Sequence, residues 1–127
     1  SIKIKTTDDL YAATDYQPLN LATAVGQLRF VKAAALDSTY VSYRDIVVLD
    51  YVPNDITVVQ GIITEEFQTP LSHVNVLSQN RKTPNMGLRN ATKNAQLLAL
   101  SGKWVRLVVG ALDWTVTEVT AAEASAS

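Results

Sequence analysis

Short runs of apolar residues, separated by polar ones, recur along the chain and predict a domain built mainly from strands. Apolar–polar alternation, or β-branched and aromatic content, marks six such runs, at 2–5, 27–31, 39–43, 61–64, 104–109 and 115–119. An uninterrupted apolar run at 46–49 lies between two acidic residues, which is typical of a strand buried on both faces. The pattern therefore predicts about seven short strands.

One segment has the spacing of a helix instead. Ser72 is a good N-cap residue, apolar positions follow it at helical intervals, and Pro84 cannot continue a helix, so we expect a helix over 73–80. We expect this helix to have an apolar inward face and a polar outward face, the first made by Val74, Val76 and Leu77 and the second by Asn75, Gln79 and Arg81.

Two shorter segments have weaker helical patterns. Residues 56–60 follow a proline and an Asn-Asp pair that can cap a helix, and residues 94–100 precede a glycine that can end one. The polar stretch 6–17 predicts a loop, and 120–127 predicts a frayed tail or linker. We therefore expect a single mixed α/β, strand-rich domain over 1–119, rather than a helical bundle or an alternating doubly wound sheet.

Composition and charge narrow the classes of function. The net charge of −1, with both signs scattered along the chain, gives no footprint for nucleic acid or an anionic membrane. The absence of cysteine excludes disulfides, thiolate metal sites and cysteine nucleophiles. No apolar run approaches the roughly 20 residues needed to cross a bilayer. Because the chain begins with serine rather than methionine, we expect it to be a segment of a longer polypeptide.

The single histidine, His73, directly follows the predicted N-cap Ser72. A lone histidine is most often a surface residue without a catalytic role, zinc or copper would need further ligands, and an adjacent serine cannot form a catalytic triad with it. At a helix N-terminus, however, free backbone N–H groups favour anions and a neutral imidazole. Neutral imidazole is a competent nucleophile toward phosphorus, so the position suits a phosphohistidine.

Other candidate sites have more ordinary interpretations. The acidic pair at 65–66 is typical of solvated loop charge rather than of general acid–base catalysis. The basic pair at 81–82 suits the C-terminal end of a helix. The glycines are spread singly and form no phosphate-binding loop, so no motif for ATP is present. Trp104 and Trp114 fit strand or core positions better than a sugar-binding platform.

A series of short motifs between residues 45 and 119 has a familiar order. It runs from the strand and Pro turn at 46–53 to Gly-Ile-Ile-Thr-Glu at 61–65, Ser-His at 72–73, Thr-Pro at 83–84, Asn-Ala-Thr at 90–92 and the glycine and hairpin at 102–119. The series resembles the mobile phosphohistidine domain of the PEP-utilising enzymes. That family includes PEP synthase, pyruvate phosphate dikinase, enzyme I of the sugar phosphotransferase system and the glucan water dikinases.

The chain departs from the usual family pattern in the loop before the histidine. Most members have a Gly-Gly pair there, whereas this chain has Gln-Thr-Pro-Leu at 68–71 and spans ten residues from Thr64 to His73. This longer version, ending in Leu-Ser-His, is similar to the glucan water dikinase type. The family's frequent Ala-Arg pair beyond the histidine is Ser-Gln at 78–79 here, so Arg81 is the candidate replacement for a phosphate-facing or docking arginine.

The resemblance implies a three-layer β/β/α swivelling domain in which His73 is the phosphorylated nucleophile. It implies phosphate-supporting roles for Ser72, Thr69 and Thr64, and a docking role for Arg81. In the family, ATP with Mg on an ATP-grasp domain, or PEP on a barrel domain, supplies the phosphoryl group, and pyruvate, water or a glucan accepts it. This domain is then expected to bind no cofactor itself, to contact neither nucleic acid nor membrane, and to be cytoplasmic.

Two alternatives from other classes stay open. The same scaffold could be a non-catalytic interaction or spacer module in which Ser-His is a relic, and the missing glycines and arginine favour that interpretation. A small carbohydrate-binding module would instead use Trp104, Trp114 and the tyrosines. It requires both tryptophans on one exposed face.

Overall fold

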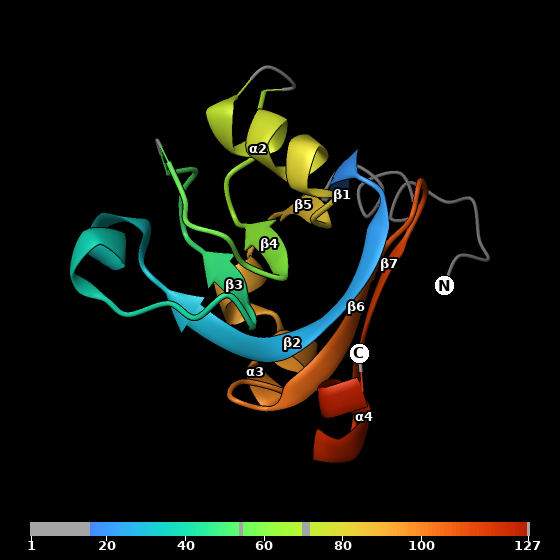
Figure 1. The fold of residues 1–127 in the computed structure, drawn as a ribbon. Helices are drawn as coiled ribbons and strands as arrows, with labels where there is room; N and C mark the ends of the chain where they lie inside the picture. The colour runs from blue at the N-terminus through green and yellow to red at the C-terminus, as the bar shows by residue number, and fades with distance from the viewer. Residues whose placement is uncertain (1–15, 54, 70–71, 127) are drawn as a thin grey trace.

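The computed structural model describes residues 16–53, 55–69 and 72–126, so the strand expected at 2–5 lies outside the described part of the chain. The described residues form a seven-stranded sheet with the order β1-β5-β4-β3-β2-β6-β7 (Figure 1). Its strands are β1 (Tyr16–Asn20), β2 (Ala22–Val31), β3 (Asp45–Leu49), β4 (Gly61–Thr64), β5 (Asn85–Leu88), β6 (Trp104–Val109) and β7 (Trp114–Glu118). The expectation of a mixed α/β, strand-rich domain is therefore confirmed.

The four central strands, β2 to β5, run parallel, and β1, β6 and β7 run antiparallel to their neighbours. Parallel neighbours need crossover connections. Three segments provide them: the 3-10 helix η1 (Ala33–Ser38), the segment 50–60, and helix α2 (His73–Arg81). β3 and β4 are buried along their whole length, as expected for strands covered on both faces.

The sheet is curled rather than flat (Figure 1). The ten-residue strand β2 serves both halves of it, because residues 22–27 pair with β6 and residues 27–31 pair with β3. The hydroxyl of Tyr16, in edge strand β1, donates a 2.6 Å hydrogen bond to the carbonyl of Gly110, in the turn between β6 and β7. This contact joins the two ends of the strand order.

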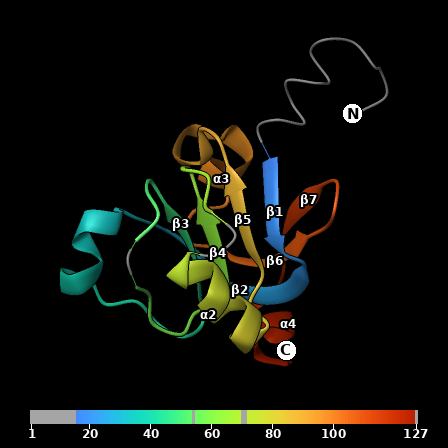
Figure 2. The same ribbon diagram turned by 90° about the horizontal axis from the view of Figure 1, so that it is seen from above.

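Alternate residues along the strands supply two apolar clusters, because successive side chains point to opposite faces of a sheet. One cluster also includes residues of η2 (Ala91–Lys93) and α3 (Ala95–Ala99); its buried members are Leu28, Ile46, Val48, Ile63, Met86, Leu88, Ala91, Leu97, Val105, Leu107, Val109 and Val116. The second cluster, called the outer cluster here, includes residues of α2 and of the segment 55–60, and Figure 2 shows α2 on the near side of the sheet. Its buried members are Val31, Val47, Leu49, Ile56, Val59, Ile62 and Val74.

The main helix prediction and one of the two weaker ones are confirmed. The helix expected at 73–80 is α2, and the one expected at 94–100 is the shorter α3. Each begins at a side-chain cap, provided by Ser72 and Asn94 respectively. α2 ends before Pro84, at a Lys82 that adopts the left-handed conformation. The strands expected at 46–49, 61–64, 104–109 and 115–119 are also present, within one residue at their ends. The strand expected at 27–31 is the second half of β2, which begins five residues earlier, at Ala22.

The strand predicted at 39–43 is wrong, because these residues form a bend and a turn. A carboxylate oxygen of Asp45 accepts the N–H of Ser42 at 2.9 Å, and the guanidinium of Arg29 donates to the carbonyl of Tyr40 at 2.6 Å. Side chains therefore take the backbone groups that strand pairing would use.

The helix predicted at 56–60 is also wrong, because this segment has no regular structure. Ile56 and Val59 are buried in the outer cluster, whereas Val58 is exposed. Three of these residues are β-branched hydrophobics, which lose rotamer freedom in a helix. The segment therefore gains its burial without forming one.

The apolar pattern did not predict β1 and β5. β1 begins within the loop expected at 6–17 and contains Pro18, whereas β5 is four residues long and contains Gly87. Proline and glycine are uncommon inside strands. Here both strands are stabilised by pairing with each other at the edge of the sheet.

Helix α4 (Ala121–Ala126) replaces part of the tail expected at 120–127. A capping box begins it: the hydroxyl of Thr120 accepts the N–H of Glu123 at 3.1 Å, and the Glu123 carboxylate accepts the N–H of Thr120 at 3.2 Å. The Thr-x-x-Glu signal was thus present in the sequence. Like the other helices of the described residues, α4 is not long and apolar enough to cross a membrane.

Candidate functional site

The candidate site lies at the start of α2, in the crossover between the parallel strands β4 and β5. β4 ends at Thr64, residues 65–69 follow the end of the strand, and α2 leads the chain back to the start of β5. In such a crossover the helix begins on the side of the sheet where the strands end, which is where α/β sheets bind their ligands.

Ser72 caps α2, and His73 is its first residue. Ser72 has extended backbone angles, φ −60° and ψ 148°, and its hydroxyl oxygen accepts the N–H of Asn75 at 3.1 Å. The N–H groups of His73 and Val74 have no carbonyl earlier in the helix to bind. The start of α2 therefore presents N–H donors and partial positive charge next to the imidazole.

The imidazole of His73 is open to solvent, with 59% of the side chain exposed. Its Nε2 lies 3.4 Å from Oδ1 of Asp55, whose side chain is 77% exposed. The carboxylate brings negative charge, and the start of the helix partial positive charge, close to the ring, so the two act in opposite directions on an approaching anion. Because both groups are exposed, the pair contributes little to stability and leaves the ring accessible.

The three residues expected to support a phosphoryl group differ in accessibility. Ser72 is half-buried at the helix start, and Thr69 is exposed, with its carbonyl accepting the N–H of Ser72 at 3.0 Å. Thr64 is fully buried: its hydroxyl donates to the carbonyl of Glu66 at 2.7 Å and accepts from Nε2 of Gln68 at 3.0 Å. Thr64 therefore supports the loop and does not face the imidazole.

Arg81 is the last residue of α2, at the opposite end of the helix from His73. Its Nη1 donates a 3.3 Å hydrogen bond to the carbonyl of Ile56, the residue after Asp55. The first residue of α2 thus contacts Asp55 and the last contacts Ile56, so both ends of the helix contact the crossover between β3 and β4. Arg81, Asp55 and Tyr40 also line a hollow of about 540 Å³ beside the helix. Arg81 is therefore exposed at the far end of the helix, and the structure does not bring it next to the imidazole.

Beneath α2 lies a buried polar cluster that the sequence pattern did not predict. Gln68 and Asn85 exchange two hydrogen bonds, of 2.8 and 2.9 Å, between their side-chain amides. Asn75 was expected to face outward, but it is buried in this cluster, and Val76 is exposed instead. The inward face of α2 is therefore partly polar. The cluster comprises Thr64, Gln68, Asn75, Ser78 and Asn85.

A trace of this cluster is visible in the sequence. Ser72, Asn75 and Ser78 recur at three-residue intervals and so share one helix face. Such a polar stripe normally faces solvent. Here it faces inward because the segment 65–72 and strand β5 supply partners for its polar atoms.

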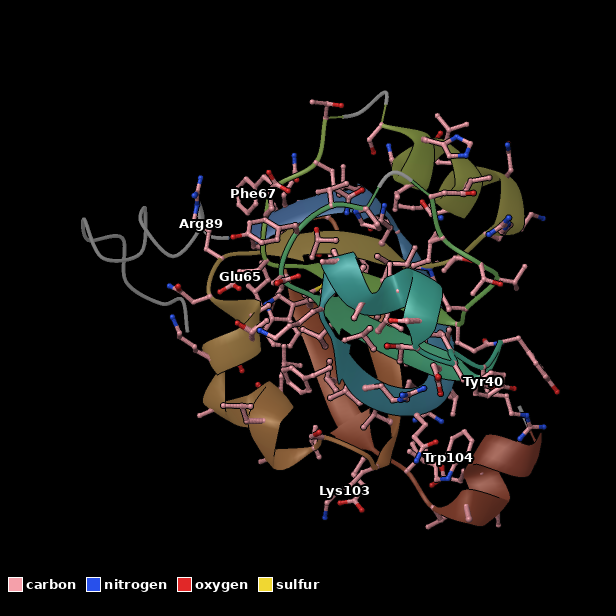
Figure 3. All side chains as sticks on the ribbon, turned by 90° about the vertical axis from the view of Figure 1, so that its left-hand side faces the viewer. Tyr40, Glu65, Phe67, Arg89, Lys103 and Trp104 are labelled. Atoms are coloured by element: carbon pink, nitrogen blue, oxygen red, sulfur yellow. The ribbon has the colours of Figure 1, made fainter. Side chains whose placement is uncertain are left out.

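The carboxylates of Glu65 and Glu66 bind different segments of the chain. A carboxylate oxygen of Glu65 accepts the hydroxyl of Thr92 at 2.8 Å, and one of Glu66 accepts a backbone N–H of the preceding crossover at 2.8 Å. Both carboxylates therefore hold loops in place. The guanidinium of Arg89 lies 4.3 Å from the centroid of the Phe67 ring, and Figure 3 shows both residues close to Glu65.

The two tryptophans do not share a surface. Trp104 begins β6 and Trp114 begins β7, and because these strands are antiparallel, with Val109 opposite Trp114, the tryptophans lie at opposite ends of the hairpin. Trp114 packs against the apolar core. Trp104 instead lies 6.0 Å from the guanidinium of Arg44, far from Phe67 in Figure 3. The arrangement does not support a carbohydrate-binding module.

No protein-family model matches the chain, and no curated protein matches it. The resemblance to phosphohistidine domains therefore rests on the motifs between residues 45 and 119. In the structure these motifs fall on β3, on β4, at the start of α2 and on the β6–β7 hairpin.

Proposed function

We propose that this chain is the phosphocarrier domain of a multidomain dikinase or PEP-utilising phosphotransferase, in which His73 accepts and relays a phosphoryl group. The observation that carries the proposal is the position of the only histidine, which is exposed at the first residue of α2 beside the N–H donors of the helix end. The surrounding motif series supports it. The three-layer β/β/α swivelling architecture belongs to the same proposal.

The proposed chemistry has two steps. A nitrogen of neutral His73 attacks the donor phosphorus and forms an N–P bond, while the bond to the leaving oxygen breaks and its electron pair stays on that oxygen. The other ring nitrogen keeps its proton, so the ring gains positive charge. An oxygen of the acceptor then attacks phosphorus, and any proton on that oxygen passes to solvent. The N–P bond breaks with its electron pair returning to nitrogen, which restores neutral imidazole. N–H groups at the start of α2 bind the phosphoryl oxygens in both steps.

The supporting residues have separate tasks in this proposal. Thr69 and the helix cap Ser72, which precede His73 in the chain, would support the phosphoryl group, whereas Thr64 would act through the loop and Arg81 through docking. The partners are an ATP-grasp domain or a PEP-binding domain as donor, and a domain that binds pyruvate, water or a glucan as acceptor. ATP with Mg, or PEP, binds on those domains in the cytoplasm.

Phosphate transfer onto the intact parent polypeptide tests the proposal. The protein is incubated with ATP labelled at the β-phosphate, or with labelled PEP, as wild type, His73→Ala and Asn80→Ala; Asn80 is an exposed residue of the same helix. We expect acid-labile, base-stable label in the wild type and in Asn80→Ala, and none in His73→Ala. The productive donor identifies the enzyme subclass. The absence of label from both donors, in a folded protein that binds ATP, would overturn the proposal.

A second candidate is a non-catalytic interaction or spacer module. The observation that favours it is the Asp55 carboxylate, which lies 3.4 Å from Nε2 of His73 and would repel an incoming phosphoryl group. The labelling experiment separates the two candidates, because a spacer takes up no label while its parent enzyme still binds nucleotide.

A further inference from the structure

The buried side chain of Gln68 uses its full hydrogen-bonding capacity beside the site. Its Nε2 donates to Oδ1 of Asn85 at 2.8 Å and to the Thr64 hydroxyl at 3.0 Å. Its Oε1 accepts from Nδ2 of Asn85 at 2.9 Å and from the Ser72 hydroxyl at 3.5 Å. A carboxamide has two donor hydrogens and two acceptor lone pairs, so all four are engaged, in a residue that is only 4% exposed.

The backbone of Gln68 is held as well. The side-chain oxygen of Gln17 accepts its N–H at 2.8 Å, and the side-chain nitrogen of Gln17 donates to its carbonyl at 2.8 Å. Because Gln17 lies in β1, Thr64 in β4 and Asn85 in β5, Gln68 is attached to three strands at once. The segment that leads to the histidine is therefore anchored to the sheet at Gln68, five residues before His73.

Gln68 also sets the direction of the Ser72 hydroxyl. That hydroxyl donates its single hydrogen toward Oε1 of Gln68 and accepts the N–H of Asn75 on its oxygen. With the hydrogen directed toward Gln68, a lone pair of the oxygen faces the N–H of Asn75. The buried side chain of Gln68 thus helps to orient the Ser72 hydroxyl that caps α2.

The same cluster fixes the rotation of α2 about its axis. Nδ2 of Asn85 lies 3.3 Å from the Ser78 hydroxyl and 3.4 Å from Oδ1 of Asn75. Together with Ser72, these contacts hold one face of the helix at three-residue intervals. Apolar packing beneath α2 comes mainly from Val74 and is non-directional, whereas hydrogen bonds depend on angle. The direction in which the first residue of α2 projects is therefore set by the polar cluster.

We propose that Gln68 is a positioning residue for His73, acting through Asn85 and the Ser72 cap. An amide is required at this position, because a carboxylate has no hydrogens for Thr64 and Asn85 and would bury a charge. The phosphoryl readout of the test rests on the proposed function, whereas the structural readout does not.

Three variants of the intact protein test this role. Gln68→Met keeps the length of the side chain and removes its hydrogen bonds. Gln68→Met/Asn85→Leu removes both partners, and such apolar pairs of similar shape can restore stability. Gln79→Met changes an exposed glutamine of the same helix and is the matched control. For each protein, the melting temperature, hydrogen exchange at the Asn75 and Val76 amides, and label uptake are measured.

In Gln68→Met, we expect the hydrogen-exchange rates of the first-turn amides of α2 to be at least tenfold higher than in wild type. The rate of label uptake should be about tenfold lower. The double variant should regain melting temperature but keep the fast exchange and slow labelling, and Gln79→Met should match the wild type. If the double variant regains slow exchange together with its melting temperature, Gln68 only fills space and the positioning role is overturned. If the wild type takes up no label, the phosphocarrier proposal fails, and the exchange comparison still decides the role of Gln68.

Discussion

Single residues at the start of α2 combine an exposed reactive group with buried support. His73 is open to solvent, whereas Gln68 and Thr64 are buried and fully hydrogen-bonded. A buried polar group left without a partner costs about 1–3 kcal/mol, so such groups hold their positions firmly. The accessible reactive group and its buried, hydrogen-bonded support therefore come from different residues.

The Asp55 carboxylate is expected to slow phosphorylation of His73. A unit negative charge about 4 Å from another raises its energy by about 1 kcal/mol in water, which corresponds to about a fivefold change in rate. We therefore expect Asp55→Asn to take up label about fivefold faster than wild type in the parent enzyme. Glu118→Gln, a change of a half-exposed carboxylate on β7, should have no effect. Slower labelling of Asp55→Asn would show instead that the carboxylate assists by stabilising the ring proton.

Removal of the Thr64 hydroxyl should destabilise the protein. In Thr64→Val, the carbonyl of Glu66 loses its donor and Nε2 of Gln68 loses one acceptor, in a fully buried site. We expect the free energy of unfolding to fall by about 1–3 kcal/mol, as measured by urea denaturation. Thr64→Ser keeps the hydroxyl and should lose less than about 1 kcal/mol. Equal losses in the two variants would assign the effect to the methyl group.

At the scale of elements, β2 approaches the backbone of the turn before β3 very closely, and this contact depends on a glycine in β2. At Gly26 a Cβ atom would lie 2.4 Å from the carbonyl oxygen of Arg44, in the turn that leads into β3. That carbonyl accepts the N–H of Gln27 at 2.9 Å, so the contact is part of the parallel pairing. Glycine at this position allows β2 to pair with β3 and β6 at once.

Gly26→Ala should therefore destabilise the folded protein. The Cβ atom meets backbone, which cannot rotate away, and we expect a loss of about 2–3 kcal/mol in the free energy of unfolding. Gly61→Ala is the matched control, because its Cβ would meet Cδ2 of Leu107 at 2.9 Å, the mobile end of a side chain. Its loss should be smaller. A melting temperature of Gly26→Ala equal to that of Gly61→Ala would contradict this account of β2.

Elements with strong local signals were predictable, and those defined by their neighbours were not. The apolar run at 46–49 and the Ser72 cap correctly predicted β3 and α2. The segment 39–43 has strand-forming residues, yet Asp45 and Arg29 bind its backbone and prevent pairing. β5 has little strand propensity, yet it lies between β4 and β1, which supply its hydrogen bonds.

On the scale of the whole molecule, Tyr16 joins the ends of the curled sheet. Its hydroxyl donates to the carbonyls of Gly110 and Asp113, at 2.6 and 3.2 Å. Burial, together with the negative charge of Asp113, raises the pKa of Tyr16 from 10.0 to about 12. The folded protein therefore holds the phenolic proton more tightly than the unfolded chain does.

This raised pKa predicts a specific loss of stability in alkali. The contribution of the Tyr16 proton is complete below pH 10 and is lost as the pH rises from 10 through about 12. At pH 7, the free energy of unfolding of Tyr16→Phe should be lower than that of the wild type by about 0.5–1.5 kcal/mol, which is the contribution of a typical hydrogen bond. The difference between the two proteins should shrink between pH 10 and 12. A difference that is constant over this range, in urea denaturation, would mean that Tyr16 does not link the sheet ends through its proton.

The sequence by itself determined the class of fold, the position of most central strands and the start of α2, because each depends on local pattern or on a single capped helix end. Only the tertiary structure decided which polar residues support that helix. Gln68 and Asn85 are 17 residues apart, and Gln17 is 51 residues from Gln68. Hydrogen bonds between such distant side chains depend on strand order and register, which apolar periodicity does not encode. For the same reason Asn75 is buried on a helix where its neighbour Val76 faces solvent.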